Sequence, residues 1–155
     1  MGEVLFYHLT RTPLEDAAPP LLEKCLERGW KVVVRAGSPE RAEALNRHLW
    51  TWRDEAFLPH GGPGDPDPAR QPIYLTAGPE TPNAPEALML VDGANADPAE
   101  LGAYVRALIL FDGHDEIALT AARGAWKGVI GAGLKAIYWA QTDGGGWAKK
   151  AESGA

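Results

Sequence analysis

Near the carboxyl end of the chain, two cationic side chains flank a tryptophan: Arg123, Trp126 and Lys127. On an α-helix, which advances about 100° per residue, these positions fall within about 100° of one another. Arginine pairs with a carboxylate through two parallel hydrogen bonds, lysine adds a point charge, and indole offers an apolar wall. The trio therefore suits a ligand that ends in an apolar or aromatic residue with a free carboxylate and nearby acids. A solvated face whose tryptophan covers a neighbouring element also fits, and spacing by itself favours that alternative.

A second aromatic group lies in the first half of the chain. Trp50 and Trp52 stand at the end of an expected helix, and Phe57, Pro59 and His60 follow within ten residues. Large apolar side chains at the exit of a helix, beside a loop rich in proline and glycine, form either a lid over the core or an exposed anchor patch. The sequence leaves both interpretations open.

The chain lacks the motifs of nucleotide binding and catalysis. It contains no G-x-x-x-x-G-K-[ST] phosphate loop and no serine in a nucleophile-elbow pattern. Residues 128–133 (GVIGAG) are glycine-rich, but they end an expected helix and lead into a strand. A dinucleotide fingerprint has the reverse order, so we interpret these glycines as a helix stop. The sequence therefore predicts no catalytic residue and no cofactor.

A metal site is not expected either. Cys25 lies among leucines, which is typical of a core position. Asp112, Asp115 and Glu116 form an acidic group, but acids at the start of a helix are favoured by the helix dipole alone. The four histidines have no ligand spacing with Cys25; they are His8, His48, His60 and His114.

The elements that must position these groups alternate between strands and helices. Strands are expected at residues 4–9, 30–35, 73–76, 87–91 and 134–139. Helices are expected at residues 13–28 with a break at Pro19-Pro20, and at residues 38–50, 98–109 and 115–130. Residues 58–72, rich in Gly, Pro and Asp, predict a surface loop. This alternation predicts an α/β fold with a mainly parallel sheet and helices on its faces.

The helix expected at residues 115–130 has one apolar side. Ile117, Ala118, Ala121, Ala125 and Val129 fall on that side, which should face the sheet. The trio of two cations and a tryptophan should then lie on the far side.

Length and composition indicate one domain that works in the cytoplasm. A chain of 155 residues suits a single core, so we expect one α/β domain at residues 1–143 and a flexible, Gly-, Lys- and Ala-rich tail at residues 144–155. We expect no signal peptide and no membrane segment, and a single cysteine fits a reducing compartment. A net charge of −6 disfavours direct binding to nucleic acid, which depends on Lys and Arg.

Ordered motifs along most of the chain resemble the chi subunit family of bacterial DNA polymerase III. These motifs are FYHL at residues 6–9, LERGWKV at 26–32, LW at 49–50 with FLPH at 57–60, LVDG at 90–93, FDG at 111–113, RGAWK at 123–127, YW at 138–139 and GGW at 145–147. Their order and spacing together carry the resemblance. Residues 61–68 and the segment after Trp147 differ from the family pattern.

The resemblance implies a Rossmann-like, nucleotide-binding-like three-layer fold without a nucleotide site, in a non-catalytic subunit associated with the clamp loader. It implies two partners: the acidic, phenylalanine-ended C-terminal tail of single-stranded-DNA-binding protein, and the psi subunit. The family's tail-binding positions match Arg123, Trp126 and Lys127. Its psi-facing positions match Trp50, Phe57, Pro59 and His60.

Two other functions stay open from the residues. A small enzyme on a Rossmann-like fold would hold a nucleotide or anion on a degenerate phosphate loop, for example at residues 35–38 (RAGS), which precede a helix. A direct single-strand binder would stack bases on tryptophan beside lysine, against the acidic net charge. Each predicts its own ligand, a nucleotide or a bare oligonucleotide.

Overall fold

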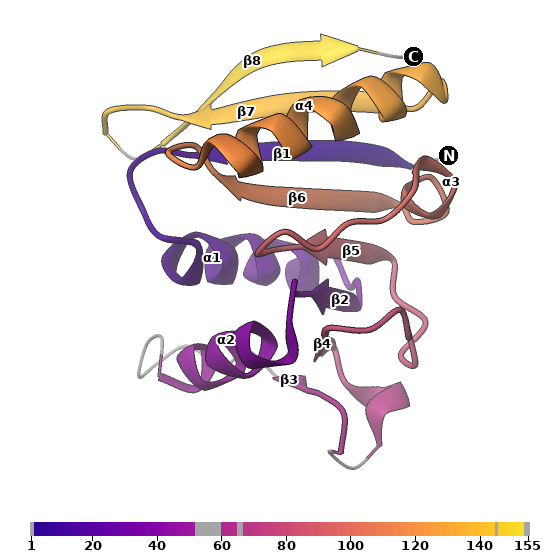
Figure 1. Ribbon diagram of the computed structural model, residues 1–155. Coiled ribbons are helices and arrows are strands. Elements are labelled where there is room, and N and C mark those ends of the chain that lie inside the picture. The colour runs from indigo at the N-terminus through magenta and orange to yellow at the C-terminus, as the bar shows by residue number, and fades with distance from the viewer. Residues whose placement is uncertain (1, 52–59, 65–66, 145, 154–155) are drawn as a thin grey trace.

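Eight strands form one sheet in the computed structural model, which describes residues 2–51, 60–64, 67–144 and 146–153 (Figure 1). Their order across the sheet is β3-β4-β2-β5-β6-β1-β7-β8, and all neighbours are parallel except β7 and β8. The strands are β1 (Glu3–Leu9), β2 (Val32–Arg35), β3 (His60–Gly61), β4 (Ile73–Thr76), β5 (Ala87–Leu90), β6 (Arg106–Asp112), β7 (Lys135–Gln141) and β8 (Trp147–Ser153). The helices are α1 (Leu14–Glu27), α2 (Pro39–Thr51), α3 (Pro98–Leu101) and α4 (Glu116–Gly131), with a 3-10 turn at Pro68–Arg70.

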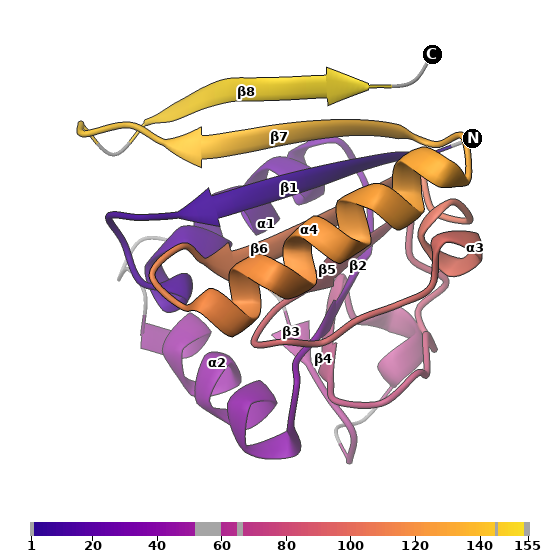
Figure 2. The same cartoon turned by 45° about the horizontal axis from the view of Figure 1, so that its top comes forward.

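Helices cover both faces of the sheet, which confirms the predicted three-layer α/β fold (Figures 1 and 2). α1 and α2 pack on one face, and α3 and α4 pack on the other. In β1, Leu5, Tyr7 and Leu9 point to the α1 side, whereas Val4 and Phe6 point to the α4 side. Because successive side chains of a strand alternate between faces, a strand that is apolar throughout must be covered on both.

The prediction of a helix at residues 98–109 was wrong. α3 ends at Leu101, and Arg106–Asp112 forms the central strand β6, between β5 and β1. Asp97 caps α3 by accepting a hydrogen bond from the Glu100 N–H at 2.8 Å. A parallel strand that is buried on both faces is a continuous apolar run, and periodicity cannot separate such a run from a buried helix.

The predicted break at Pro19-Pro20 was also wrong, because α1 is continuous from Leu14 to Glu27. Each proline removes one backbone hydrogen bond from the helix. Pro19 is buried together with Ala18 and Leu22 against the sheet, so tertiary packing maintains the helix across the two missing bonds. The helix ends before Gly29, at φ 79°, as the sequence predicts.

Two segments that were predicted to be irregular form edge strands instead. Within residues 58–72, His60–Gly61 is buried and pairs with β4 as β3. Within the predicted tail, Trp147–Ser153 pairs with β7 as β8, and the Trp147 ring packs edge-on against Tyr7 with ring centroids 5.1 Å apart. The cross-strand partner and the aromatic contact lie far away in the sequence, so local composition does not reveal either strand.

Cys25 is a core residue, as predicted, with 2% of its surface exposed. Among the helices that the structure describes, none has the length and apolar character needed to cross a membrane.

Candidate peptide-binding site on helix α4

Helix α4 is fixed at both ends. The Asp115 carboxylate accepts hydrogen bonds from the backbone N–H groups of Ile117 at 2.9 Å and Ala118 at 3.3 Å, which caps the first turn. Gly133, at φ 78°, reverses the chain into β7 after the last turn. The helix therefore presents its side chains at defined positions over β6, β1 and β7.

The predicted apolar side of α4 was only partly correct, because Ala118, Ala125 and Val129 pack toward the sheet but Ile117 and Ala121 do not. Ile117 is 82% exposed and Ala121 is exposed, whereas Ala122 and Val129 are buried against the sheet. The half-buried Trp126 lies on the border of the buried stripe and not on the far side. Burying an indole removes more apolar surface from water than burying the isoleucine, so the helix turns its tryptophan toward the core.

Trp126 joins a cluster of rings at the surface of the sheet, which we call the aromatic cluster and which consists of Phe6, His8, Phe111, Trp126 and Tyr138. The Trp126 ring stands edge-on to Phe6 and Tyr138, with centroid distances of 5.4 Å and 5.9 Å. His8 and Tyr138 share a hydrogen bond, with 3.0 Å between Nδ1 and Oη. Because Trp126, Tyr138 and His8 are only partly buried, the cluster offers an apolar surface to a ligand.

Arg123 and Lys127 flank this surface and are exposed. In the described part of the chain neither has an acidic side chain within ion-pairing distance. Burial lowers the pKa of His8, the imidazole of His114 and the guanidinium of Arg123 lower it further, and Asp112 opposes the shift. Burial raises the pKa of Tyr138, and Arg123 counteracts that rise. Arg123 is therefore an electrostatic neighbour of the aromatic cluster.

Two comparisons with known proteins bear on this site. The family model described as "DNA polymerase III chi subunit, HolC" matches residues 1–136. This chain belongs to the DNA polymerase III chi subunit family. A "Probable DNA polymerase III subunit chi" from Rickettsia prowazekii (strain Madrid E) is 35% identical over 91 residues. That match covers 59% of this chain and about half, 55%, of the length of the relative.

The four residues expected to face a psi subunit do not form one described surface of this chi family member. Trp50 lies in the last turn of α2, where the structure describes its backbone only, and Phe57 and Pro59 lie outside the described residues. His60 is only 7% exposed, and its Nε2 lies 3.3 Å from the Asn46 carbonyl oxygen. His60 is thus part of the interior beside α2.

His8 and Tyr138 were missed by sequence reasoning although they contact the same ring cluster as Trp126. They are 130 residues apart, and only the parallel pairing of β1 with β7, in which Phe6 is opposite Tyr138, brings them together. No local spacing signals such a contact.

In an open α/β sheet, phosphate binds where the helices that follow two neighbouring strands cover opposite faces of the sheet. Here β1 and β6 are such neighbours, because α1 follows β1 on one face and α4 follows β6 on the other, so the loop after β1 lies at this position. In this chi family member the Gln141 side chain fills that place. Its Oε1 accepts hydrogen bonds from the backbone N–H groups of Thr10 at 2.9 Å, Arg11 at 2.8 Å and Thr12 at 3.2 Å. Its Nε2 donates to Thr12 Oγ1 at 2.8 Å. A carboxamide oxygen therefore uses the donors that a phosphate would need.

We expect Gln141→Ala to lower the free energy of unfolding by about 1–2 kcal/mol, because three backbone N–H groups lose a common acceptor and water replaces it only in part. Urea denaturation measures this change. Gln141→Glu keeps an acceptor oxygen at the same position and should retain most of the stability. Equal losses in the two variants would show that the shared acceptor oxygen is not the stabilising feature.

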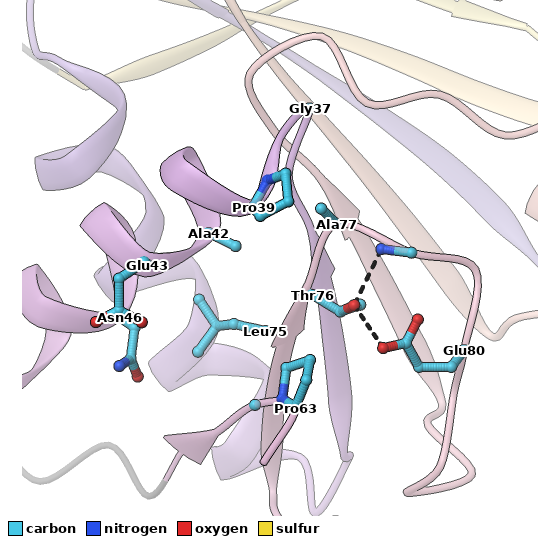
Figure 3. A pocket seen from close by; sticks show the side chains of 12 residues that line it. Gly37, Pro39, Ala42, Glu43, Asn46, Pro63, Leu75, Thr76, Ala77 and Glu80 are labelled. Carbon is cyan, nitrogen blue, oxygen red and sulfur yellow. Dashed lines mark hydrogen bonds between the residues drawn. The ribbon is translucent and has the colours of Figure 1, made fainter. Parts of the chain in front are cut away.

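A cavity of about 840 Å³ lies between α2 and the end of β4 (Figure 3). Glu43 and Glu80 line it. The Thr76 hydroxyl donates to Glu80 at 2.7 Å, and this bond is the main cause of a lowered pKa of Glu80, which stays ionised at neutral pH. An anionic cavity disfavours phosphate.

In the loop at residues 35–38, which borders this cavity, the Ser38 and Arg35 side chains already have partners within the protein. Ser38 Oγ accepts a hydrogen bond from the Arg41 N–H at 3.2 Å and thus caps α2. Arg35 is turned toward Glu100, with 2.9 Å between the guanidinium and the carboxylate. Among the described residues no three His, Cys, Asp or Glu side chains are grouped as metal ligands.

Proposed function

We propose that this protein binds the acidic C-terminal tail of single-stranded-DNA-binding protein and thereby tethers the polymerase III machinery to coated single strands. The observation that carries the proposal is a pair of cations, Arg123 and Lys127, beside the half-buried Trp126 on a chain of the chi family. Among the residues that the structure describes, neither cation has an acidic partner. Exposed cations next to an open aromatic surface match a peptide that carries acids and ends in an aromatic residue.

In this proposal Arg123 pairs with the terminal carboxylate of the tail. The last aromatic ring packs against Trp126 and Tyr138, and Lys127 attracts the acids upstream. An exposed ion pair contributes only about 0–1 kcal/mol, so several contacts must act together. Micromolar affinity, about −8 kcal/mol, is the expectation for one short peptide. Many tails on one coated strand raise the effective affinity without new contacts.

The sheet beside α4 provides room for such a peptide. β8 lies outside the area that α4 covers in both views (Figures 1 and 2). Tyr138 is opposite Ala151, and Ala140 is opposite Ala148. Directly opposed residues of antiparallel strands share a face, so the β8 residues paired with Tyr138 and Ala140 on the α4 side are alanines. These two alanines leave space on that face for a ring beside Tyr138.

A second partner of the proposed assembly is the psi subunit, on the end of α2 and the segment that follows. Trp50, Phe57 and Pro59 would contact psi directly. Because His60 is buried against Asn46, we assign to it the positioning of this segment and not a direct contact. As a replication subunit the protein would work in the cytoplasm, without catalysis, a cofactor or direct contact with nucleic acid.

Co-sedimentation separates this function from the alternatives. The protein should sediment with oligonucleotide coated by single-stranded-DNA-binding protein, and it should stay in the supernatant when the coating protein lacks its acidic tail. Binding to bare oligonucleotide would support direct stacking on the DNA instead. A rise in melting temperature with a nucleotide would support the enzyme, although Gln141 occupies the phosphate position.

A further inference from the structure

His8 is held in one orientation inside the aromatic cluster. Its ring lies 5.2 Å from the Phe111 ring and 5.9 Å from the Tyr138 ring, and its Nδ1 shares the hydrogen bond with the Tyr138 hydroxyl. Gly113 packs directly on the opposite edge of the imidazole, where a Cβ atom would overlap Nε2 and Cδ2. The imidazole is therefore a fixed, partly exposed group.

Four titratable or charged groups face this imidazole from the surrounding elements. Arg123 approaches from α4, Tyr138 from β7, His114 from the turn before α4, and Asp112 from the end of β6. Asp112 also accepts a hydrogen bond from the His114 N–H at 2.9 Å. The exposed cation Arg123 thus lies near both the aromatic cluster and an imidazole that burial and positive charge keep neutral at pH 7.

We propose that His8 is a further recognition residue of the α4 site and that it takes up a proton when an acidic peptide binds. The inference rests on the proposed function, since it requires a peptide carboxylate at Arg123. That carboxylate would cancel the charge of Arg123 and place a negative group near the imidazole. Both changes favour the imidazolium form, which can then attract the carboxylate as a third cation.

The sign of the pH effect follows from linkage. The pKa of His8 is lowered in the free protein, and a bound carboxylate raises it. Affinity therefore increases as the pH falls through the interval between the bound and the free pKa, where binding takes up a proton. A rise of one pKa unit corresponds to a tenfold gain in affinity, so we expect a gain of about three- to tenfold between pH 8 and pH 5.5.

Calorimetry of the full chain tests this inference with an acidic peptide that ends in Pro-Phe and a free carboxylate. Titrations at pH 6 in two buffers of different ionisation enthalpy give the number of protons taken up. We expect about a quarter to a half of a proton per peptide in the wild-type protein, which matches the three- to tenfold gain, and near zero in His8→Gln, which keeps a polar side chain beside Tyr138. The matched control His114→Gln removes one of the groups that lower the pKa of His8, so the pH of maximal uptake should move upward, but proton uptake on peptide binding should remain.

Two results would overturn the inference while the proposed function stands: equal proton uptake in His8→Gln and the wild type, or an uptake that disappears only in His114→Gln. Peptide binding that depends on Arg123 but is independent of pH would have the same meaning. The absence of peptide binding at any pH would contradict the proposed function, and it would contradict the role of His8 as well. Circular dichroism of His8→Gln checks that the variant is folded.

Discussion

Replacing Arg123 or Lys127 by alanine should weaken the binding of an acidic, phenylalanine-ended peptide by about tenfold. Each cation is exposed, is without an acidic partner in the described part of the chain, and lies beside the half-buried Trp126. A charge-assisted contact next to an apolar surface is stronger than an isolated surface pair, because the ring of the ligand excludes part of the water. Calorimetric titration measures the loss, which should shrink in high salt.

The matched control for these variants is Lys24→Ala. Lys24 is exposed on α1, across the sheet from α4, so its removal changes the net charge equally without touching the site. Its affinity should stay within about twofold of the wild type. Alanine or glycine changes between Gly61 and Pro68 should also cost less than either cation. Equal losses from this loop and from Arg123 would contradict the assignment of the site.

Glu100→Ala should lower the free energy of unfolding by about 2–3 kcal/mol, the largest effect on stability that we expect from a single surface-reaching side chain. Arg35, at the end of β2, is 6% exposed, and two of its nitrogens contact the Glu100 carboxylate at 2.9 Å and 3.1 Å. Without Glu100 a buried cation loses its counter-charge. Hydrogen bonds to the carbonyl oxygens of Gly78 and Pro79, at 3.0 Å and 3.3 Å, remain and limit the loss.

Urea denaturation at pH 7 measures this change, with the exposed Glu27→Ala as control. The pH dependence of the free energy of unfolding provides a second test of the same ion pair. The hydrogen bond from Arg35 is the main cause of a lowered pKa of Glu100. The ionised Glu100 side chain therefore contributes its full stabilisation above the ordinary pKa of 4.5. This stabilisation is lost as the pH falls through the lower pKa of the folded protein. The stability difference between wild type and Glu100→Ala should therefore narrow in acid. A difference that is constant from pH 7 to pH 3 would contradict the ion-pair explanation.

The sequence predicts the elements whose signals are local. Ser38 and Pro39 start α2, Asp115 starts α4, and Gly29 stops α1, because a cap or a positive φ needs only neighbouring residues. β6 was missed because its apolar run satisfies a helix and a buried strand equally, and the choice depends on β5 and β1 beside it. β8 was missed because its partner strand, and the contact of Trp147 with Tyr7, are not encoded near residue 147.

In the candidate site, too, local spacing could be predicted from the sequence, whereas contacts between distant residues could not. The helical spacing of Arg123, Trp126 and Lys127 grouped the trio but by itself favoured a solvated face, and the resemblance to the chi family was needed to select it as a candidate site. The helix wheel also placed Trp126 on the wrong side. A wheel gives the angles between residues and not the direction of the core, which the packing of Trp126 on Phe6 and Tyr138 determines. His8 enters the site only through the pairing of β1 with β7 and the contact with Gly113.

The most direct test of the central claim is a calorimetric titration of the protein, at low salt, with the acidic Pro-Phe peptide in two forms. One form has a free terminal carboxylate and the other is amidated. We predict micromolar binding of the free form and at least a tenfold loss on amidation, with little further loss when the amidated form meets Arg123→Ala. Equal binding of both forms, or no binding of the free form, would contradict the assignment of Arg123 as the partner of the tail's carboxylate.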